Sequence, residues 1–154
     1  MKIDLAERYA QRIAERCKSV NGLLATPLCD FEAVRIHQVW IFGSTVKGSQ
    51  DPNDLDVMVR YNQVGRRRNW RQGKLDLQAR RSWGYSRAIC ASKEMYKWLS
   101  KGMKHVSRHN YEAEKGLDLG VMVMIYPRND FPAYMERLRA SGVNTYERPD
   151  YKPF

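Results

Sequence analysis

The sequence predicts an α/β (α+β) fold in which a mixed β-sheet packs against helices, and three observations support this class. The chain has 154 residues, enough to bury one core of ordinary size. Its residues are 43% hydrophobic and 29% charged, which is typical of globular domains. Helical and strand patterns alternate along the chain, as they do in layered folds. We therefore expect a single domain over residues 1–142 and an extended C-terminal tail over 143–154.

The first half of the chain is expected to hold two helices and two strands. Apolar residues recur at three- and four-residue spacing over residues 3–20, which predicts an amphipathic helix that ends at Asn21-Gly22. A short helix is expected near Asp30–Arg35. The apolar run Val39–Phe42 and the alternating run Asp54–Tyr61 predict two strands, joined by a polar loop.

The second half is expected to add further helices and one strong strand. The basic stretch 62–85 has little periodicity, so a loop with an exposed helix is expected there. Residues 86–101 predict a helix, and Leu117–Tyr126 predict a strand. A last helix is expected to run from an N-cap at Asp130 through Ala140.

Composition also excludes several classes of protein. No stretch approaches the 18 or so consecutive apolar residues that a transmembrane helix needs, and the first residues do not read as a secretory signal. The three cysteines, Cys17, Cys29 and Cys90, form no CxxC pair, which disfavours a disulfide scaffold. We expect a cytoplasmic protein without a membrane partner.

Positive charge is concentrated in one segment. Residues 60–87 contain nine lysines and arginines and a single acid, so they carry most of the formal net charge of +10. Guanidinium groups neutralise phosphates, and aromatic rings stack on bases. We predict that this segment contacts nucleic acid, and a solvated basic face is the alternative. The residues expected to make these contacts are Arg66, Arg67, Arg68, Trp70 and Arg71.

Paired aspartates give the strongest chemical signal. Asp54 and Asp56 open the second predicted strand, where side chains two residues apart point to the same face. Their Cα atoms would be roughly 6.5 Å apart. Two carboxylates so close repel each other unless a cation lies between them. Such hard oxygen ligands suit Mg²⁺ or Mn²⁺, metals that support phosphoryl and nucleotidyl transfer.

A glycine-serine turn lies just before these aspartates. Gly43 allows a phosphate to approach the backbone closely, and the following N–H groups with the Ser44 hydroxyl can hold phosphate oxygens. Lys47 would add a positive charge. We therefore predict a nucleotide-binding turn at Gly43, Ser44 and Lys47. An ordinary turn beside a solvent-facing edge strand is the alternative.

The window from Val39 to Arg60 resembles the signature of the nucleotidyltransferase superfamily of the DNA polymerase β type, especially its minimal single-domain members. Phe42-Gly43-Ser44, Gly48 and Asp54-Leu55-Asp56 carry the resemblance, with a spacing one residue tighter than usual. The resemblance implies transfer of NMP from an NTP to a hydroxyl acceptor, with release of pyrophosphate. It also implies that a partner protein is possible. The basic segment favours an RNA or other nucleic-acid end as acceptor. The resemblance also allows a protein side chain or, last in rank, a small molecule such as an aminoglycoside, whose positive charge fits a basic surface poorly.

The resemblance further implies a third carboxylate from a later strand. We predict Asp118 as the third catalytic and metal-binding residue beside Asp54 and Asp56; Asp76, Glu112 and Glu114 are the alternatives. His109 is expected to be a surface or structural histidine, or else to face the nucleotide pocket. The second functional hypothesis is a catalytically inactive nucleotidyltransferase-like module that binds nucleic acid through residues 60–87.

Overall fold

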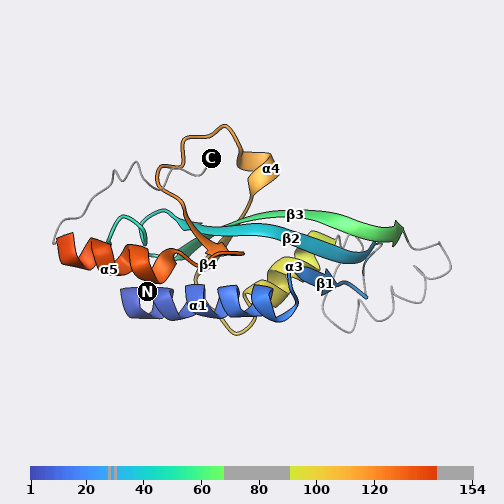
Figure 1. Cartoon of the computed structure of the whole chain (residues 1–154), viewed down its shortest axis with the longest axis horizontal. Helices are drawn as coiled ribbons and strands as arrows, with labels where there is room; N and C mark the ends of the chain where they lie inside the picture. The colour runs from blue at the N-terminus through green and yellow to red at the C-terminus, as the bar shows by residue number, and fades with distance from the viewer. Residues whose placement is uncertain (28, 30, 68–90, 142–154) are drawn as a thin grey trace.

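A mixed sheet of five strands organises the computed structural model, which describes residues 1–27, 29, 31–67 and 91–141 (Figure 1). Four helices accompany the sheet in this part of the chain, so the expected α+β class is confirmed. The elements, in chain order, are α1 (Ile3–Ser19), β1 (Leu23–Ala25), β2 (Phe31–Phe42), β3 (Leu55–Arg67), α3 (Ala91–Leu99), β4 (Val106–Asn110), α4 (Tyr111–Glu114), β5 (Val123–Tyr126) and α5 (Phe131–Ser141).

The long strand β2 is the centre of the sheet. Along one edge it pairs antiparallel with β3, and both β1 and β5 also pair antiparallel with it, at different positions along its length. Beyond β3 lies β4, and this pair is parallel. The register sets Asp56 opposite Phe42 on β2 and opposite Ser107 on β4. Three strands therefore bring their ends together around Asp56.

The two faces of the sheet bury different sets of side chains. Helices α1, α3 and α5 cover one face, where Ile13, Met95 and Tyr134 join the main core (Figure 1). On the other face, α4 and the loop after it cover a smaller cluster of Trp40, Phe42, Met58 and Met122. Because side chains alternate along a strand, Asp56 shares this second face with Met58.

The amphipathic pattern correctly predicted α1, in which seven side chains at helical spacing are buried. The final helix is confirmed as α5. The helix expected near Asp30–Arg35 is wrong, because residues from Phe31 onward belong to β2, where Val34 and Ile36 point inward in strand alternation. The later strand covers only Val123–Tyr126 of the expected Leu117–Tyr126. The segment of His109 is a strand, β4.

Other expectations concern residues that the structure leaves undescribed. The helix expected over 86–101 is described from residue 91 onward, as α3. Most of the basic stretch 62–85 and the tail 143–154 lie outside the described residues.

None of the described helices combines the length and apolar character needed to cross a bilayer.

The loop between β2 and β3 is fastened to helices near both ends of the described chain. In the buried interior, the Tyr134 hydroxyl of α5 donates to the Val46 carbonyl at 2.6 Å. At the start of α1, the Ile3 amide donates to the Gln50 carbonyl at 3.0 Å. Pairing of the flanking strands then fixes the two ends of the loop. The segment expected to bind phosphate is thus held from several directions.

Candidate functional site

The predicted glycine-serine turn directly contacts one of the predicted aspartates. Gly43 has a φ of +74°, which favours glycine, and a Cβ atom placed on it would collide with Oδ2 of Asp56. The missing side chain therefore makes room for this carboxylate. Asp56 comes from β3 and Gly43 follows the last residue of β2, so the antiparallel pairing of these strands explains the contact.

The turn itself offers hydrogen-bond donors. Lys47 N–H donates to the Gly43 carbonyl at 3.3 Å, which closes one helix-like turn. Among the described residues, no hydrogen-bond acceptor is found for the amide groups of residues 44 to 46. The Thr45 hydroxyl in the same turn is buried and has no hydrogen-bond partner in the described part of the protein. Backbone N–H groups without an acceptor at the start of a turn can donate to an anion.

Asp54 and Asp56 lie close enough to influence each other. Both side chains are half-buried, and Ser107 of β4 donates a hydrogen bond from its hydroxyl to Oδ2 of Asp54. Burial raises the pKa of Asp56, and the neighbouring charge of Asp54 raises it further. His109 and Lys47 oppose this shift in the pKa of Asp56, through their positive charge. The carboxylate pair thus holds negative charge that a cation would stabilise.

His109 connects this pair to a third acid. Its Nε2 atom lies 3.5 Å from Oδ1 of Asp56, and its Nδ1 atom lies 3.0 Å from Oε1 of Glu114. The Nε2 atom is buried, and no hydrogen-bond partner is found for it among the described residues. The His109 ring meets the Phe42 ring edge-on, with centroids 4.9 Å apart. Packing and Glu114 together therefore hold the imidazole against Asp56.

Asp118, the expected third carboxylate, occupies the loop between α4 and β5. Its side chain is exposed, and its Oδ1 accepts a hydrogen bond from the Gly120 amide at 3.1 Å. Within residues 1–27, 29, 31–67 and 91–141, no group of three His, Cys, Asp or Glu side chains is arranged to hold a metal ion. Asp118 therefore does not complete such a group with Asp54 and Asp56 here. Asp76 lies outside the described residues.

The residues expected to bind nucleic acid cannot be placed relative to this site. Arg68, Trp70 and Arg71 lie outside the described residues, as do the side chains of Arg66 and Arg67 at the end of β3. Their predicted role stays a prediction. Arg60, earlier in the same strand, is described: its guanidinium lies 5.3 Å from the centroid of the Tyr111 ring of α4.

Sequence reasoning missed Ser107 and gave Glu114 only as an alternative acid. Neither residue belongs to a recognisable sequence motif. The parallel pairing of β3 with β4, which a single sequence does not reveal, brings them to the aspartates. Comparison with known proteins gives no match to a family model, a curated protein or a solved structure.

Proposed function

We propose that the protein is a metal-dependent nucleotidyltransferase that transfers NMP from an NTP to a hydroxyl acceptor. The observation that carries the proposal is the contact of the Asp56 carboxylate with Gly43, beside Asp54. It joins a backbone site for phosphate to a pair of carboxylates suited to a divalent cation. Binding an NTP–metal complex needs both parts at once.

Different residues of the chain would bind the phosphates, hold the metal ion and orient the carboxylates. The amide groups of residues 44 to 46, with the Ser44 hydroxyl and Lys47, would bind phosphate oxygens. Asp54 and Asp56 would hold Mg²⁺ or Mn²⁺, and Ser107 keeps the Asp54 carboxylate oriented. His109, itself held by Glu114, orients Asp56. A bound metal ion would neutralise phosphate charge and acidify the attacking hydroxyl.

The proposed reaction is an in-line displacement at the α-phosphorus. The acceptor oxygen forms a bond to this phosphorus while the bond to the oxygen bridging to the β-phosphate breaks. Pyrophosphate leaves with the electron pair of that bond, and the proton of the acceptor hydroxyl passes to solvent water. An RNA end is the favoured acceptor because of the basic charge in residues 60–87, and a protein hydroxyl is the alternative.

The test is transfer of a labelled NMP in the presence of Mg²⁺ and a pool of RNA and protein acceptors. Wild type should label an acceptor, and the double change Asp54→Ala with Asp56→Ala should reduce labelling to background. Asp51→Ala is the matched control, because this exposed aspartate pairs with Lys2 at 2.7 Å and should leave transfer intact. Transfer that survives the double change would show that these aspartates are not the metal site.

One observation favours a second candidate, a catalytically inactive module that binds nucleic acid. In the described part of the chain, the carboxylate pair belongs to no group of three metal-binding side chains, and Nε2 of His109 lies 3.5 Å from Oδ1 of Asp56. Under this alternative, RNA binding should be unaffected by NTP, by a chelator and by the double aspartate change. Loss of NMP transfer on that change would instead favour the enzyme.

A further inference from the structure

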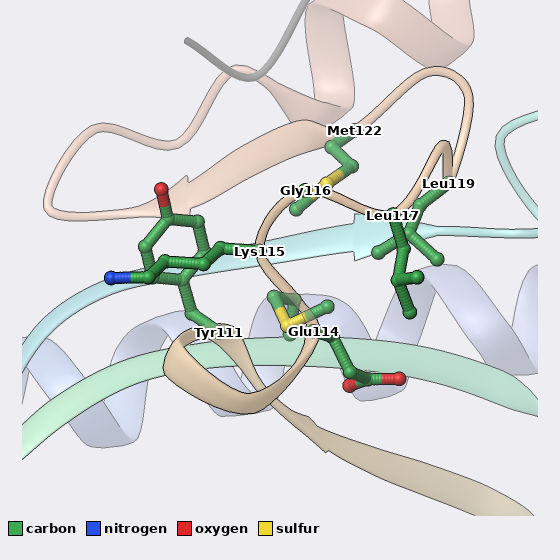
Figure 2. A pocket seen from close by; sticks show the side chains of 8 residues that line it. Tyr111, Glu114, Lys115, Gly116, Leu117, Leu119 and Met122 are labelled. Atoms are coloured by element: carbon green, nitrogen blue, oxygen red, sulfur yellow. The ribbon is translucent and has the colours of Figure 1, made fainter.

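A pocket lies beside the carboxylate pair, on the face of the sheet that α4 covers. Figure 2 shows Tyr111 and Lys115 on one side of it and Leu117 and Leu119 on the other. Its cavity volume is about 60 Å³, and the empty space reaches about 310 Å³ when open solvent at the mouth is counted. A pocket this small and partly open suits a flat ring better than a bulky group.

The lining of the pocket is mostly apolar, and part of this apolar surface is exposed to solvent. Met58 and Met122 form part of the small buried cluster, and Leu119 packs against it. Leu117 at the rim is 63% exposed, the higher value of the two exposed large hydrophobic residues in the described chain. Exposed apolar surface beside a hollow is typical of a ligand site. Methionine sulfur also packs favourably on aromatic rings.

The Tyr111 wall of this pocket is held in place. The Tyr111 ring lies 5.5 Å from the Trp40 ring between centroids, at an interplanar angle of 34°. The Arg60 guanidinium lies near the same ring, and Arg60 pairs with Glu112 at 3.6 Å. The pocket therefore has a wall that needs little rearrangement to accept a ligand.

Two connections join the pocket to the aspartates. Met58 is two residues beyond Asp56 on the same face of β3, so their Cα atoms are roughly 6.5 Å apart. Glu114 lines the pocket and also lies 3.0 Å from His109, which in turn faces Asp56. A ligand with its phosphates at Asp54 and Asp56 can therefore reach this pocket with its other end.

A second hollow on the surface is a poorer fit for a flat apolar group. Its volume is about 550 Å³, and its lining includes the polar side chains Gln38, Arg60 and Asn62. Arg60 and Asn62 lie four and six residues beyond Asp56, whereas Met58 is only two residues away. The apolar pocket is both nearer and chemically better suited to an unsaturated ring.

We infer that the apolar pocket lined by Met58, Tyr111, Leu119 and Met122 binds the base of the NTP. This inference rests on the proposed function, because it needs the triphosphate to bind at Gly43-Ser44 and the aspartates. The base stacks on the methionines and Leu119, with Leu117 covering its outer edge. Binding then depends on the base as well as on the phosphates.

Isothermal titration calorimetry with Mg²⁺ tests this with two ligands, ATP and inorganic tripolyphosphate, which lacks a base. Wild type should bind ATP about tenfold or more tightly than tripolyphosphate, the range expected from stacking one base. Leu119→Trp should fill the pocket and abolish this preference without changing tripolyphosphate affinity. Leu23→Trp is the matched control, since Leu23 is 43% exposed on β1 and should leave both affinities unchanged.

Leu117→Ser keeps the test decisive if Leu119→Trp disturbs folding, because Leu117 is exposed. It should weaken ATP binding alone. Equal binding of ATP and tripolyphosphate by wild type would overturn the base pocket while leaving the proposed function standing, and would favour an apolar side chain of a protein partner as occupant. Equal weakening of both ligands by Leu119→Trp would also overturn it. Failure of wild type to bind either ligand would overturn the proposed function and this inference together.

Discussion

At the scale of single residues, the absence of a side chain at Gly43 decides whether the site can form. Gly43→Ala would bring a Cβ atom into the Asp56 carboxylate, in addition to the cost of an alanine at positive φ. We expect the free energy of unfolding to fall by more than the roughly 1–2 kcal/mol that an alanine at positive φ costs by itself. Urea denaturation would measure this change.

Gly102→Ala separates the two contributions. Gly102 has a φ of +77°, close to that of Gly43, but nothing lies within 4 Å of a Cβ atom placed there. It should lose only the backbone part, about 1–2 kcal/mol. Equal losses of stability in the two variants would mean that the Asp56 carboxylate does not pack against Gly43.

The raised pKa of Asp56 gives a second prediction, for stability measured in a chelating buffer. In the unfolded chain Asp56 titrates near 3.8, and burial with the charge of Asp54 raises its pKa in the folded state. Between these two pKa values the folded state binds more protons, so Asp56 lowers stability as pH rises through that window. The penalty is complete above the folded pKa.

Asp56→Asn should therefore raise the melting temperature at pH 7, and this gain should vanish as the pH falls below 3.8. Asp51→Asn is the control of opposite sign, because a hydrogen bond from Lys2 lowers the pKa of Asp51. It should not raise the melting temperature. A lower melting temperature for Asp56→Asn at pH 7 would mean that the Asp56 carboxylate is stabilised by His109 and Lys47 more than it is destabilised by burial and by the charge of Asp54.

At the scale of elements, one arginine joins α1 to the end of α3. The Arg16 guanidinium donates to the carbonyls of Leu99 and Lys101, each at 2.7 Å, and to that of Trp98 at 3.2 Å. The last carbonyl groups of a helix lack partners within it, and a cation there also interacts favourably with the negative end of the helix dipole. Arg16 thus caps a neighbouring helix.

Arg16→Ala should lower the free energy of unfolding by about 1–3 kcal/mol, as for hydrogen bonds from a charged group. Chemical denaturation would measure it. Arg12→Ala, one turn earlier on an exposed part of α1, should change stability by no more than about 0.5 kcal/mol. If the two variants were equally stable, the three carbonyl contacts would contribute nothing to the packing of α3.

Sequence periodicity predicted some elements well and others poorly, for physical reasons. The apolar pattern of α1 extends over several turns, so only the helical spacing of three to four residues fits it. Residues 31–35 are too few to distinguish helix from strand, and pairing with β1 and β3 decides their conformation. The strand β4 lacks a buried apolar alternation and owes its place to backbone pairing with β3.

The candidate site likewise contains residues that the sequence indicates and residues that only the fold brings together. Gly43, Ser44, Asp54 and Asp56 are close in sequence, so a local motif identified them. Ser107, His109 and Glu114 lie about fifty residues further along, and only the β3–β4 register brings them to the aspartates. No periodicity in one sequence reports that register.

At the scale of the whole molecule, the net charge of +10 predicts salt-sensitive binding to single-stranded RNA. Replacing Arg66, Arg67, Arg68 and Arg71 by alanine should reduce the slope of log affinity against log salt by up to about 3, at about 0.7 for each phosphate contact. Fluorescence anisotropy at several salt concentrations would measure the slope.

Charge removed elsewhere provides the control. Replacing Lys93, Lys97, Lys101 and Lys104 by alanine removes the same charge from exposed positions in and after α3. This variant should keep a slope close to that of wild type. If both variants lose the same slope, the charge of the molecule as a whole, rather than the segment 60–87, governs RNA binding.

The attachments of the β2–β3 loop have a consequence for the thermodynamics of binding. The bonds from Tyr134 to Val46 and from Ile3 to Gln50 restrict the loop before any ligand arrives. Much of its conformational entropy has therefore been lost during folding, so little more would be lost on binding of phosphate at the proposed site. If the proposed phosphate site is correct, a helix at each end of the described chain would contribute to ligand affinity without touching the ligand.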